Sequence, residues 1–499
     1  MLSILAVILV ALSRSSWIWP LAPIGAICGY ALIWKSAARA PFLKSLTLFF
    51  CANLIHLCWM LSHPYLYIVA VWIALSLFLA LPYALLSKYI ITRPISTAAS
   101  LLYASLLTLC EWLFTLIPPC GFSFQNAALH LSWSTFALQT ASVIGAAGLS
   151  FIVFWTNILF FARRYRLAAA VALFPYLIGA ALYLPRASQQ TEYMRVALVH
   201  TEEPPDIYQE PTDPYKLHEK KWSSLLKSIE HIQKDEVDCI IFPEGSVPFP
   251  AQYPLSQVQS LPEHYRPVYS APLSSLEIAR RVATHLNTPI IFGSEARVGG
   301  SSYNSCFFVP PSNQTIHRYD KQLLLPFGEY IPFDSLRSYL KEHYGLCGSF
   351  LPGKGPRLFD KNHLRLAPFI CYEETFPSYA QQALLLRPKC LISLSNDAWF
   401  PHSRLAREHL ETGRLRAVEI GKPLVRSCNM GVSTAIDALG RTIATSTSCE
   451  IIEVNLYSPY CLYATLGHTT VIFLIGLVGL AAMLVEWRRS QNLSEAPHE

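Results

Sequence analysis

Residues 66–86 read LYIVAVWIALSLFLALPYALL and contain no charged side chain. A helix needs roughly 17 to 25 predominantly apolar residues to cross the hydrocarbon core of a bilayer. Similar runs occur four more times within the first 184 residues or so and once near the C-terminus, at 46–61, 95–117, 136–161, 167–184 and 466–485. These runs predict a bundle of membrane-spanning helices, although any single one, taken alone, also fits a buried core helix.

The overall composition agrees with a membrane protein. The chain has 499 residues, of which 52% are hydrophobic and only 14% are charged, and its mean hydropathy is +0.32. Soluble domains carry about 25% charged residues. The net charge of +6 does not indicate nucleic acid, because such binding needs Lys and Arg clustered on one solvated face.

The beginning of the chain is harder to interpret. Residues 2–12 and 19–34 are apolar but short, and Pro20 and Pro23 interrupt the second run. We interpret them as a tight helical hairpin. This interpretation gives about seven crossings before the middle of the chain and one after it, so about eight in all.

The positions of basic residues predict how these helices are oriented. Cytoplasmic loops carry an excess of Lys and Arg, and basic residues follow the second, fourth, sixth and eighth runs: Lys35, Arg39, Lys44, Lys88, Arg93, Arg163, Arg164, Arg166, Arg488 and Arg489. This parity predicts that both termini are cytoplasmic and that residues 193–460 lie outside the cytoplasm. A cleaved signal peptide fits less well, because residues 1–12 lack a basic segment.

The middle of the chain has a different pattern. Short β-branched runs at 196–200, 239–242, 289–293, 306–309, 366–371 and 390–395 are interspersed with helix-like stretches at 215–233, 273–286 and 405–421. Such interspersion predicts an α/β layered domain. We therefore expect a membrane domain at 1–190, a catalytic domain at 193–460 and a last transmembrane helix at 466–487.

Three segments of this domain carry side chains that chemistry could use. They are CIIFPEGSVPF at 239–249, HRYDKQLLLPFGEYIPF at 317–333 and LAPFICYEETFP at 366–377. Each also has an ordinary explanation: Glu244 as a helix cap, Lys321 and Glu329 as a surface ion pair, and Cys371 as a small buried hydrophobe.

The cysteines do not indicate a metal site. The sequence has 13 of them, but no C-x-x-C pair and no Cys/His pattern typical of zinc. No metal or other cofactor is predicted. Disulfide pairing among the cysteines of the outer domain stays open.

Taken together and in this order, the three segments resemble the nitrilase superfamily, whose members use a Glu, Lys and Cys triad. The strings YDKQLLLPFGEYIPF, ICYEETFP and SNDAWF, placed between seven apolar helices and one, resemble more closely the apolipoprotein N-acyltransferases of bacterial inner membranes. This resemblance implies a four-layer αββα sandwich outside the cytoplasm.

The resemblance also implies roles for individual residues. Glu244 would be the general base, Lys321 the transition-state stabiliser and Cys371 the nucleophile that accepts the acyl group. Further matching positions are implied to support the triad (Glu329, Glu373, Tyr372 and Asn304) or to contact substrate (Asn396 and Trp399, with Asp397 and Ala398 beside them). Departures from the family pattern are Pro401, Glu408 and the membrane segment EWLFTLIPPCGF at 111–122.

The implied reaction moves a fatty acyl chain from a phospholipid, such as phosphatidylethanolamine, to the amine of a diacylglyceryl apolipoprotein. Two alternatives stay open at this stage. A membrane-tethered amidase could hydrolyse a small C–N bond with the same triad. The protein could also be a transporter or a noncatalytic assembly protein. For such a protein we would expect more polar residues within the helices than Glu111 and Asn157.

Overall fold

The computed structural model describes residues 1–14, 18–117, 121–205, 213–312, 314–331, 334–344, 350–361 and 364–494. Internal contacts divide the chain into two compact units. The first, here called the membrane unit, comprises Met1–Ser188, Ser403–Ile420 and Tyr460–Glu499. The second, the sheet unit, comprises Gln189–His402 and Gly421–Pro459.

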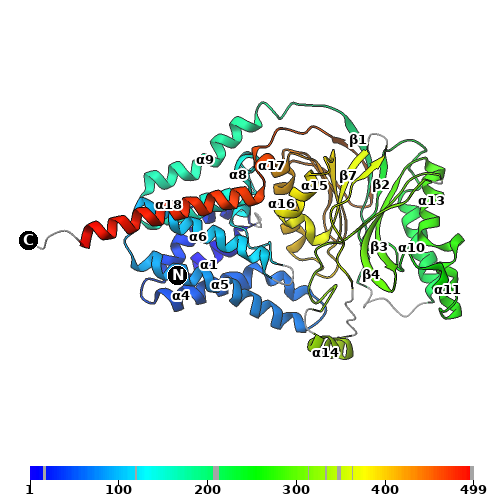
Figure 1. Ribbon diagram of the computed structural model, residues 1–499, viewed down its shortest axis with the longest axis horizontal. Coiled ribbons are helices and arrows are strands. Elements are labelled where there is room, and N and C mark those ends of the chain that lie inside the picture. Colours follow the sequence, from blue (N-terminus) through cyan, green and yellow to red (C-terminus); the bar gives the residue numbers. More distant parts are fainter. Residues whose placement is uncertain are drawn as a thin grey trace, which may run out of the picture. The chain divides into compact units, whose positions relative to one another are not determined.

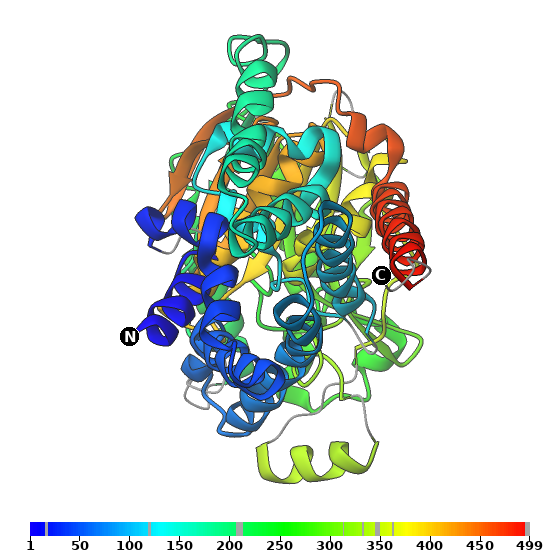
Figure 2. The same cartoon turned by 90° about the vertical axis from the view of Figure 1, so that its left-hand side faces the viewer.

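The membrane unit consists of helices (Figure 2). In chain order they are α1 (Leu2–Leu12), η2 (Trp19–Leu21), α2 (Ala22–Ile24), η3 (Gly25–Gly29), α3 (Tyr30–Ser36), α4 (Pro41–His56), η4 (Cys58–Ser62), α5 (Tyr67–Thr92), α6 (Thr97–Leu116), η5 (Ala127–Leu131), α7 (Thr135–Gln139), α8 (Ala141–Phe161), α9 (Tyr165–Tyr183), α16 (Leu405–Ile420), α17 (Leu462–Leu466) and α18 (His468–Ser494).

Among the described residues, five helices are long and apolar enough to cross a membrane: α5, α6, α8, α9 and α18. These correspond to five of the predicted runs. The remaining apolar segments are shorter, since α1 has 11 residues and α4 has 16. The predicted membrane bundle is confirmed, and the number of eight crossings stays a prediction.

The run at 136–161 was expected to form one helix, and this expectation was wrong. The structure places α7 before α8, and Gly145 inside α8 has non-helical torsions with φ 65°. A Cβ at Gly145 would overlap the ring of Tyr463, so only glycine fits here. Glu419 accepts a 2.5 Å hydrogen bond from the backbone N–H of Ala146, just past the break.

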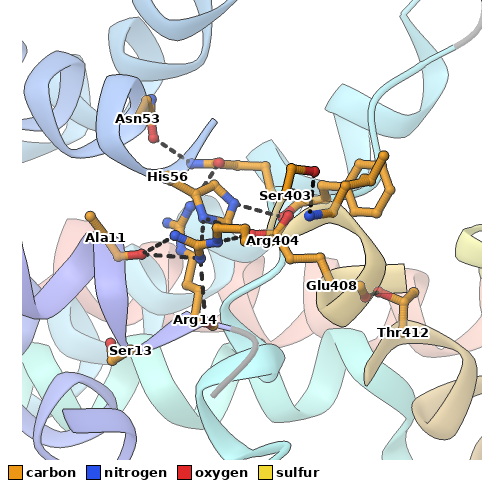
Figure 3. A network of polar contacts seen from close by, with 12 residues as sticks. Ala11, Ser13, Arg14, Asn53, His56, Ser403, Arg404, Glu408 and Thr412 are labelled. Atoms are coloured by element: carbon orange, nitrogen blue, oxygen red, sulfur yellow. Dashed lines mark hydrogen bonds and ion pairs between the residues drawn. The ribbon is translucent and has the colours of Figure 1, made fainter. Parts of the chain in front are cut away.

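A buried polar network holds the start of α16 inside the membrane unit (Figure 3). Arg404 Nε lies 2.6 Å from Glu408 Oε1, and its guanidinium donates to the carbonyl oxygen of Ala11 at 3.2 Å. His56 Nδ1 lies 3.0 Å from Arg404 Nη2. The charge of Glu408, a departure from the family pattern, is therefore compensated by Arg404.

The sheet unit contains two six-stranded sheets, with strand orders β12-β1-β2-β3-β4-β5 and β11-β10-β9-β8-β7-β6. The strands are β1 (Tyr193–Val199), β2 (Cys239–Ile241), β3 (Ile290–Val298), β4 (Ser301–Val309), β5 (His317–Asp320), β6 (Phe359–Lys361), β7 (Leu364–Ile370), β8 (Cys390–Asn396), β9 (Leu424–Asn429), β10 (Ser433–Ile436), β11 (Thr442–Ser446) and β12 (Cys449–Asn455). Pairing is parallel for β1-β2-β3 and for β7-β8-β9.

The sheet unit also contains the helices α10 (Pro214–Ser228), α11 (Leu255–Val258), η7 (Glu263–Tyr265), α12 (Arg266–Tyr269), η8 (Ala271–Leu273), α13 (Ser275–Leu286), α14 (Asp334–Tyr344), η9 (Cys371–Thr375) and α15 (Pro377–Leu384). Figure 1 shows the two sheets as adjacent layers, with α10 and α13 beyond β2 and β3, and α15 beside β7.

Two hydrophobic cores explain this layering. One joins the facing surfaces of the two sheets through residues such as Ile241 and Ile392. The other packs the outer face of the first sheet against α10 and α13 through Trp222, Ala279 and Phe292. A sheet whose two faces are both apolar must be covered on both sides, and the predicted α/β sandwich is confirmed.

All six predicted strands and all three predicted helices of the middle section are present, with ends shifted by a few residues. The sequence reasoning had not identified β5, β6 or β9 to β12. The predicted domain boundaries, 1–190, 193–460 and 466–487, stay predictions. The contacts group 403–420, including α16, with the membrane unit.

Candidate active site

The three predicted triad residues lie just past the ends of three strands. Glu244 follows β2 by three residues, Lys321 directly follows β5, and Cys371 directly follows β7. The fold brings them together, because Lys321 Nζ lies 3.8 Å from Glu244 Oε1. The Cys371 thiol is close enough to both that their charges act on its pKa.

Cys371 has an unusual backbone conformation. Its φ of 53° lies in the left-handed region, which costs a non-glycine residue roughly 1 to 2 kcal/mol. The cysteine sits where the strand turns sharply into the short helix η9. Such strain is found at functional sites when the surrounding structure holds it in place.

Glu373 holds this turn. Its carboxylate accepts hydrogen bonds from the backbone N–H of Ile370 at 2.8 Å and from the backbone N–H of Gln322 at 2.6 Å. The Tyr319 hydroxyl donates to it at 2.8 Å. One buried carboxylate therefore ties the cysteine turn to the segment that carries Lys321.

Lys321 is a buried cation between two carboxylates. Its Nζ lies 2.9 Å from Glu329 Oε2 as well as 3.8 Å from Glu244. The amide nitrogen of Asn304 donates to both acids, at 2.7 Å to Glu244 and 2.6 Å to Glu329. Asn304 and Glu329 therefore fix the distance between Glu244 and Lys321.

Burial and neighbouring charges set the ionisation of these groups. Burial lowers the pKa of Lys321, but the Glu329 and Glu244 carboxylates outweigh it and hold that pKa above its ordinary value. Burial raises the pKa of Glu244, opposed by Lys321 and reinforced by Glu329. Lys321 is thus a permanent cation, and Glu244 is a stronger base than an exposed glutamate.

The pKa of the Cys371 thiol differs from the expectation drawn from the sequence. From the sequence, both Lys321 and Glu244 were expected to increase the reactive, ionised fraction of the Cys371 thiol. Instead, burial and the Glu244 carboxylate raise the pKa of this thiol, and Lys321 only partly opposes them. The resting site holds a neutral thiol, so a nucleophilic role for Cys371 would require a base that removes its proton during attack.

The predicted substrate-contacting residues lie on the loop after β8. Asn396 Oδ1 accepts from the backbone N–H of Ala398 at 3.1 Å and from Asn429 Nδ2 at 2.9 Å. Trp399 is half-buried. Tyr372 is buried and its ring packs edge-to-face on Phe376 at 4.9 Å, so its side chain has a packing role.

Sequence reasoning missed Asn429 and Ser395. Asn429 ends β9 in register with Asn396 at the end of β8, and its side chain bonds Asn396 and the backbone of Glu203. Ser395 gives Cys371 a side-chain hydrogen bond. Polar residues ending the apolar runs of β8 and β9 were the available signal, the same one that singled out Glu244.

The structure also locates the apolar loop residues and Glu111, which are not part of the candidate triad. Leu323, Leu324 and Ile331 are buried and pack inside the structure, whereas Leu351 is exposed. The sequence reasoning had considered the apolar segments 323–327, 331–333 and 350–352 either as shields that keep water from the site or as ordinary packing segments. Residues 332–333 lie outside the described part of the chain. Glu111 accepts from the Tyr83 hydroxyl at 3.2 Å and from the backbone of Ala127 at 2.8 Å, so it is bonded to neighbouring segments of the membrane unit.

The cysteines that the structure describes are all free. Cys120 and Cys347 lie outside the described residues.

Comparisons with known proteins agree with both units. The carbon-nitrogen hydrolase family model matches residues 206–456, and the model of the apolipoprotein N-acyltransferase N-terminal domain matches residues 6–159. Among solved structures, a carbon-nitrogen hydrolase superfamily protein from Xanthomonas campestris matches with a TM-score of 0.37 and 17% identity, covering 57% of this chain and 97% of its own.

Curated relatives match over most of their length. The apolipoprotein N-acyltransferase of Chlamydia pneumoniae is 32% identical, over 84% of this chain and 83% of its own. That of Chlamydia caviae is 30% identical, over 95% of both chains. With both family models and these full-length relatives in agreement, the chain belongs to the apolipoprotein N-acyltransferase family, membrane-bound acyltransferases within the carbon-nitrogen hydrolase superfamily.

Proposed function

We propose that this protein transfers a fatty acyl chain from a phospholipid to the N-terminal amine of diacylglyceryl apolipoproteins, through a thioester on Cys371. Phosphatidylethanolamine is the proposed donor. The protein would reside in the bacterial inner membrane, with both termini in the cytoplasm and the sheet unit on the periplasmic side. The distribution of basic residues in the sequence supports this orientation.

The observation that carries the proposal is the strained Cys371 beside a buried base and a buried cation. In the first half-reaction Glu244 takes the thiol proton while sulfur attacks the ester carbonyl. Lys321 and the backbone N–H of Tyr372 stabilise the oxyanion, and one such donor is worth about 3 to 4 kcal/mol. Glu244 then gives its proton to the departing lysophospholipid.

In the second half-reaction an amine attacks the thioester. An α-amino group has a reference pKa of about 7.7 to 8.0 and must be neutral to attack. Glu244 accepts its proton, so one base serves both steps. Dividing the transfer in two removes the need to align two large lipids at once.

The membrane helices would hold the site close to both of its lipid substrates. The donor ester and the lipid-anchored amine already lie at the bilayer surface, and a membrane-bound site meets them without extracting either lipid. The competing proposal, a membrane-tethered amidase acting on a small C–N bond, gives these helices no role.

The test uses the full-length protein in detergent with phosphatidylethanolamine of defined acyl composition. Mass spectrometry should find one acyl chain on the peptide containing Cys371, and adding a diacylglyceryl peptide should remove it. Cys371→Ser should give neither adduct nor product, while Cys449→Ser, which changes another buried cysteine, should behave as wild type. Normal turnover by Cys371→Ser would contradict the proposal.

A further inference from the structure

A cavity of about 30 Å³ lies beside Glu244 in the sheet unit. Its wall also includes Ser246, Lys221 and Glu203. A cavity needs about 10 to 15 Å³ to hold one water molecule, so this one has room for water and for little else. Substrate lipid cannot enter a space of this size.

One residue of the wall carries a polar atom without a partner. The hydroxyl oxygen of Ser246 is buried and has no hydrogen-bond partner among the residues that the structure describes. A buried hydroxyl without a partner is costly, and a water in the cavity would satisfy it. The neighbouring Asn429 is already engaged, because its Oδ1 accepts from Thr201 Oγ1 at 2.9 Å and from the backbone of Glu203 at 2.8 Å.

The cavity joins the buried base to the protein surface. The side chain of Glu244 is 11% exposed and that of Lys221 is 13% exposed, whereas that of Glu203 is 41% exposed. Lys221 Nζ lies 2.6 Å from Glu203 Oε2. A water beside Glu244 would therefore adjoin an ion pair that reaches solvent.

We propose that this cavity holds the water through which Glu244 discharges a proton to solvent, by way of Glu203 and Lys221, when the amine attacks the thioester. The inference rests on the proposed function. It assigns Ser246, Lys221 and Glu203 as positioning residues for a proton exit.

The proton balance of the reaction requires such an exit. Near neutral pH much of the amine arrives as an ammonium. When the C–N bond forms and the C–S bond breaks, the nitrogen loses two protons: one restores the Cys371 thiol, and the other must leave the site. The first half-reaction releases none, because the thiol proton departs on the lysophospholipid.

Other charged groups also face Glu244 and will shape its titration: Lys321, Glu329, Asp397 and Cys371. Each of them belongs to the reacting cluster and is common to both half-reactions. A variant that slows only the second half-reaction therefore acts through the cavity and not through this cluster.

The test measures single-turnover aminolysis from roughly pH 6.5 to pH 9, using full-length protein already loaded with an acyl chain and a diacylglyceryl peptide as acceptor. Ser246→Val should fill the cavity, and Glu203→Gln should remove the outer proton acceptor without changing a buried residue. In both variants aminolysis should be about tenfold slower than in wild type near pH 6.5. Its rate should approach that of wild type near pH 9, where the amine arrives neutral. Acyl loading should be unchanged, and Glu202→Gln, at the exposed neighbouring position, should match wild type throughout.

Equal slowing at every pH, slower acyl loading, or unaltered aminolysis in both variants would each overturn the inference. So would a loss of thioester hydrolysis with normal aminolysis, because the cavity water would then be a nucleophile. Failure of the wild-type protein to form the thioester would instead contradict the proposed function.

Discussion

Lys321 is surrounded by more negative charge than its own charge can balance. Its Nζ lies 2.9 Å from Glu329 Oε2 and 3.8 Å from Glu244 Oε1. The side chain of Lys321 is only 2% exposed. Removing one partner of a buried ion pair typically costs about 3 to 5 kcal/mol, because the remaining charge stays buried. The lysine therefore contributes to stability as well as to the proposed chemistry.

A pair of variants separates these contributions. Lys321→Met should abolish thioester formation and lower the melting temperature in detergent by several degrees. The double variant Lys321→Met/Glu329→Gln should recover most of the melting temperature, because one carboxylate is neutralised, but should stay inactive. Acylation by the double variant at the wild-type rate would remove Lys321 from the mechanism.

Glu373 should make stability depend on pH. Burial raises its pKa to about 7, against the opposing backbone hydrogen bond from Ile370, while an unfolded glutamate has a pKa of about 4.3. Because the folded state holds this proton more tightly, the stabilisation is fully present below the unfolded pKa and is lost as pH rises through the folded pKa.

The corresponding measurement compares wild type with Glu373→Gln. Between roughly pH 5 and pH 8 the melting temperature of wild type should fall relative to that of the variant, whose amide does not titrate. Parallel curves would show that this carboxyl does not change its ionisation in that range.

At the scale of an element, β3 positions Glu244, the proposed base, on the loop after β2. A Cβ at Gly293 would lie 2.6 Å from the Cα of Glu244 and 3.0 Å from the backbone nitrogen of Gly245. These are backbone atoms, which cannot rotate away as a flexible side chain would. Close contact between the two strands therefore requires glycine.

Gly293→Ala should slow thioester formation by about tenfold to a hundredfold, because a displacement near 1 Å can cost that much. Gly476→Ala is the matched control, since a Cβ there meets no atom within 4 Å. Single-turnover acylation checks both, and wild-type rates for Gly293→Ala would show that Glu244 tolerates the shift.

For the whole molecule, the proposed orientation predicts which parts face which compartment. The hairpin between β3 and β4 turns at Gly299 and Gly300, where a Cβ would meet nothing. Alkaline phosphatase inserted there should be active, because it matures only outside the cytoplasm, and green fluorescent protein fused after Glu499 should fluoresce. The reverse pattern would place the reaction on the cytoplasmic side.

The sequence by itself predicted the five long apolar helices and half of the described strands, and the three candidate site residues came from the family resemblance. The helices and strands depend on local patterns, namely uninterrupted apolar runs and short β-branched runs. The missed strands β5, β6 and β9 lack such a pattern. For example, β9 contains Arg426, whose side chain is buried with Glu374 at 2.9 Å.

Only the tertiary structure decided which partner each polar group has. Glu373 and Glu374 are adjacent in the sequence, yet one holds the cysteine turn and the other pairs with Arg426. The raised pKa of the Cys371 thiol, the break at Gly145 and the grouping of α16 with the membrane unit were likewise not predicted. The physical reason is that burial and charge at each of these positions come from residues far away in the chain, which no local pattern records.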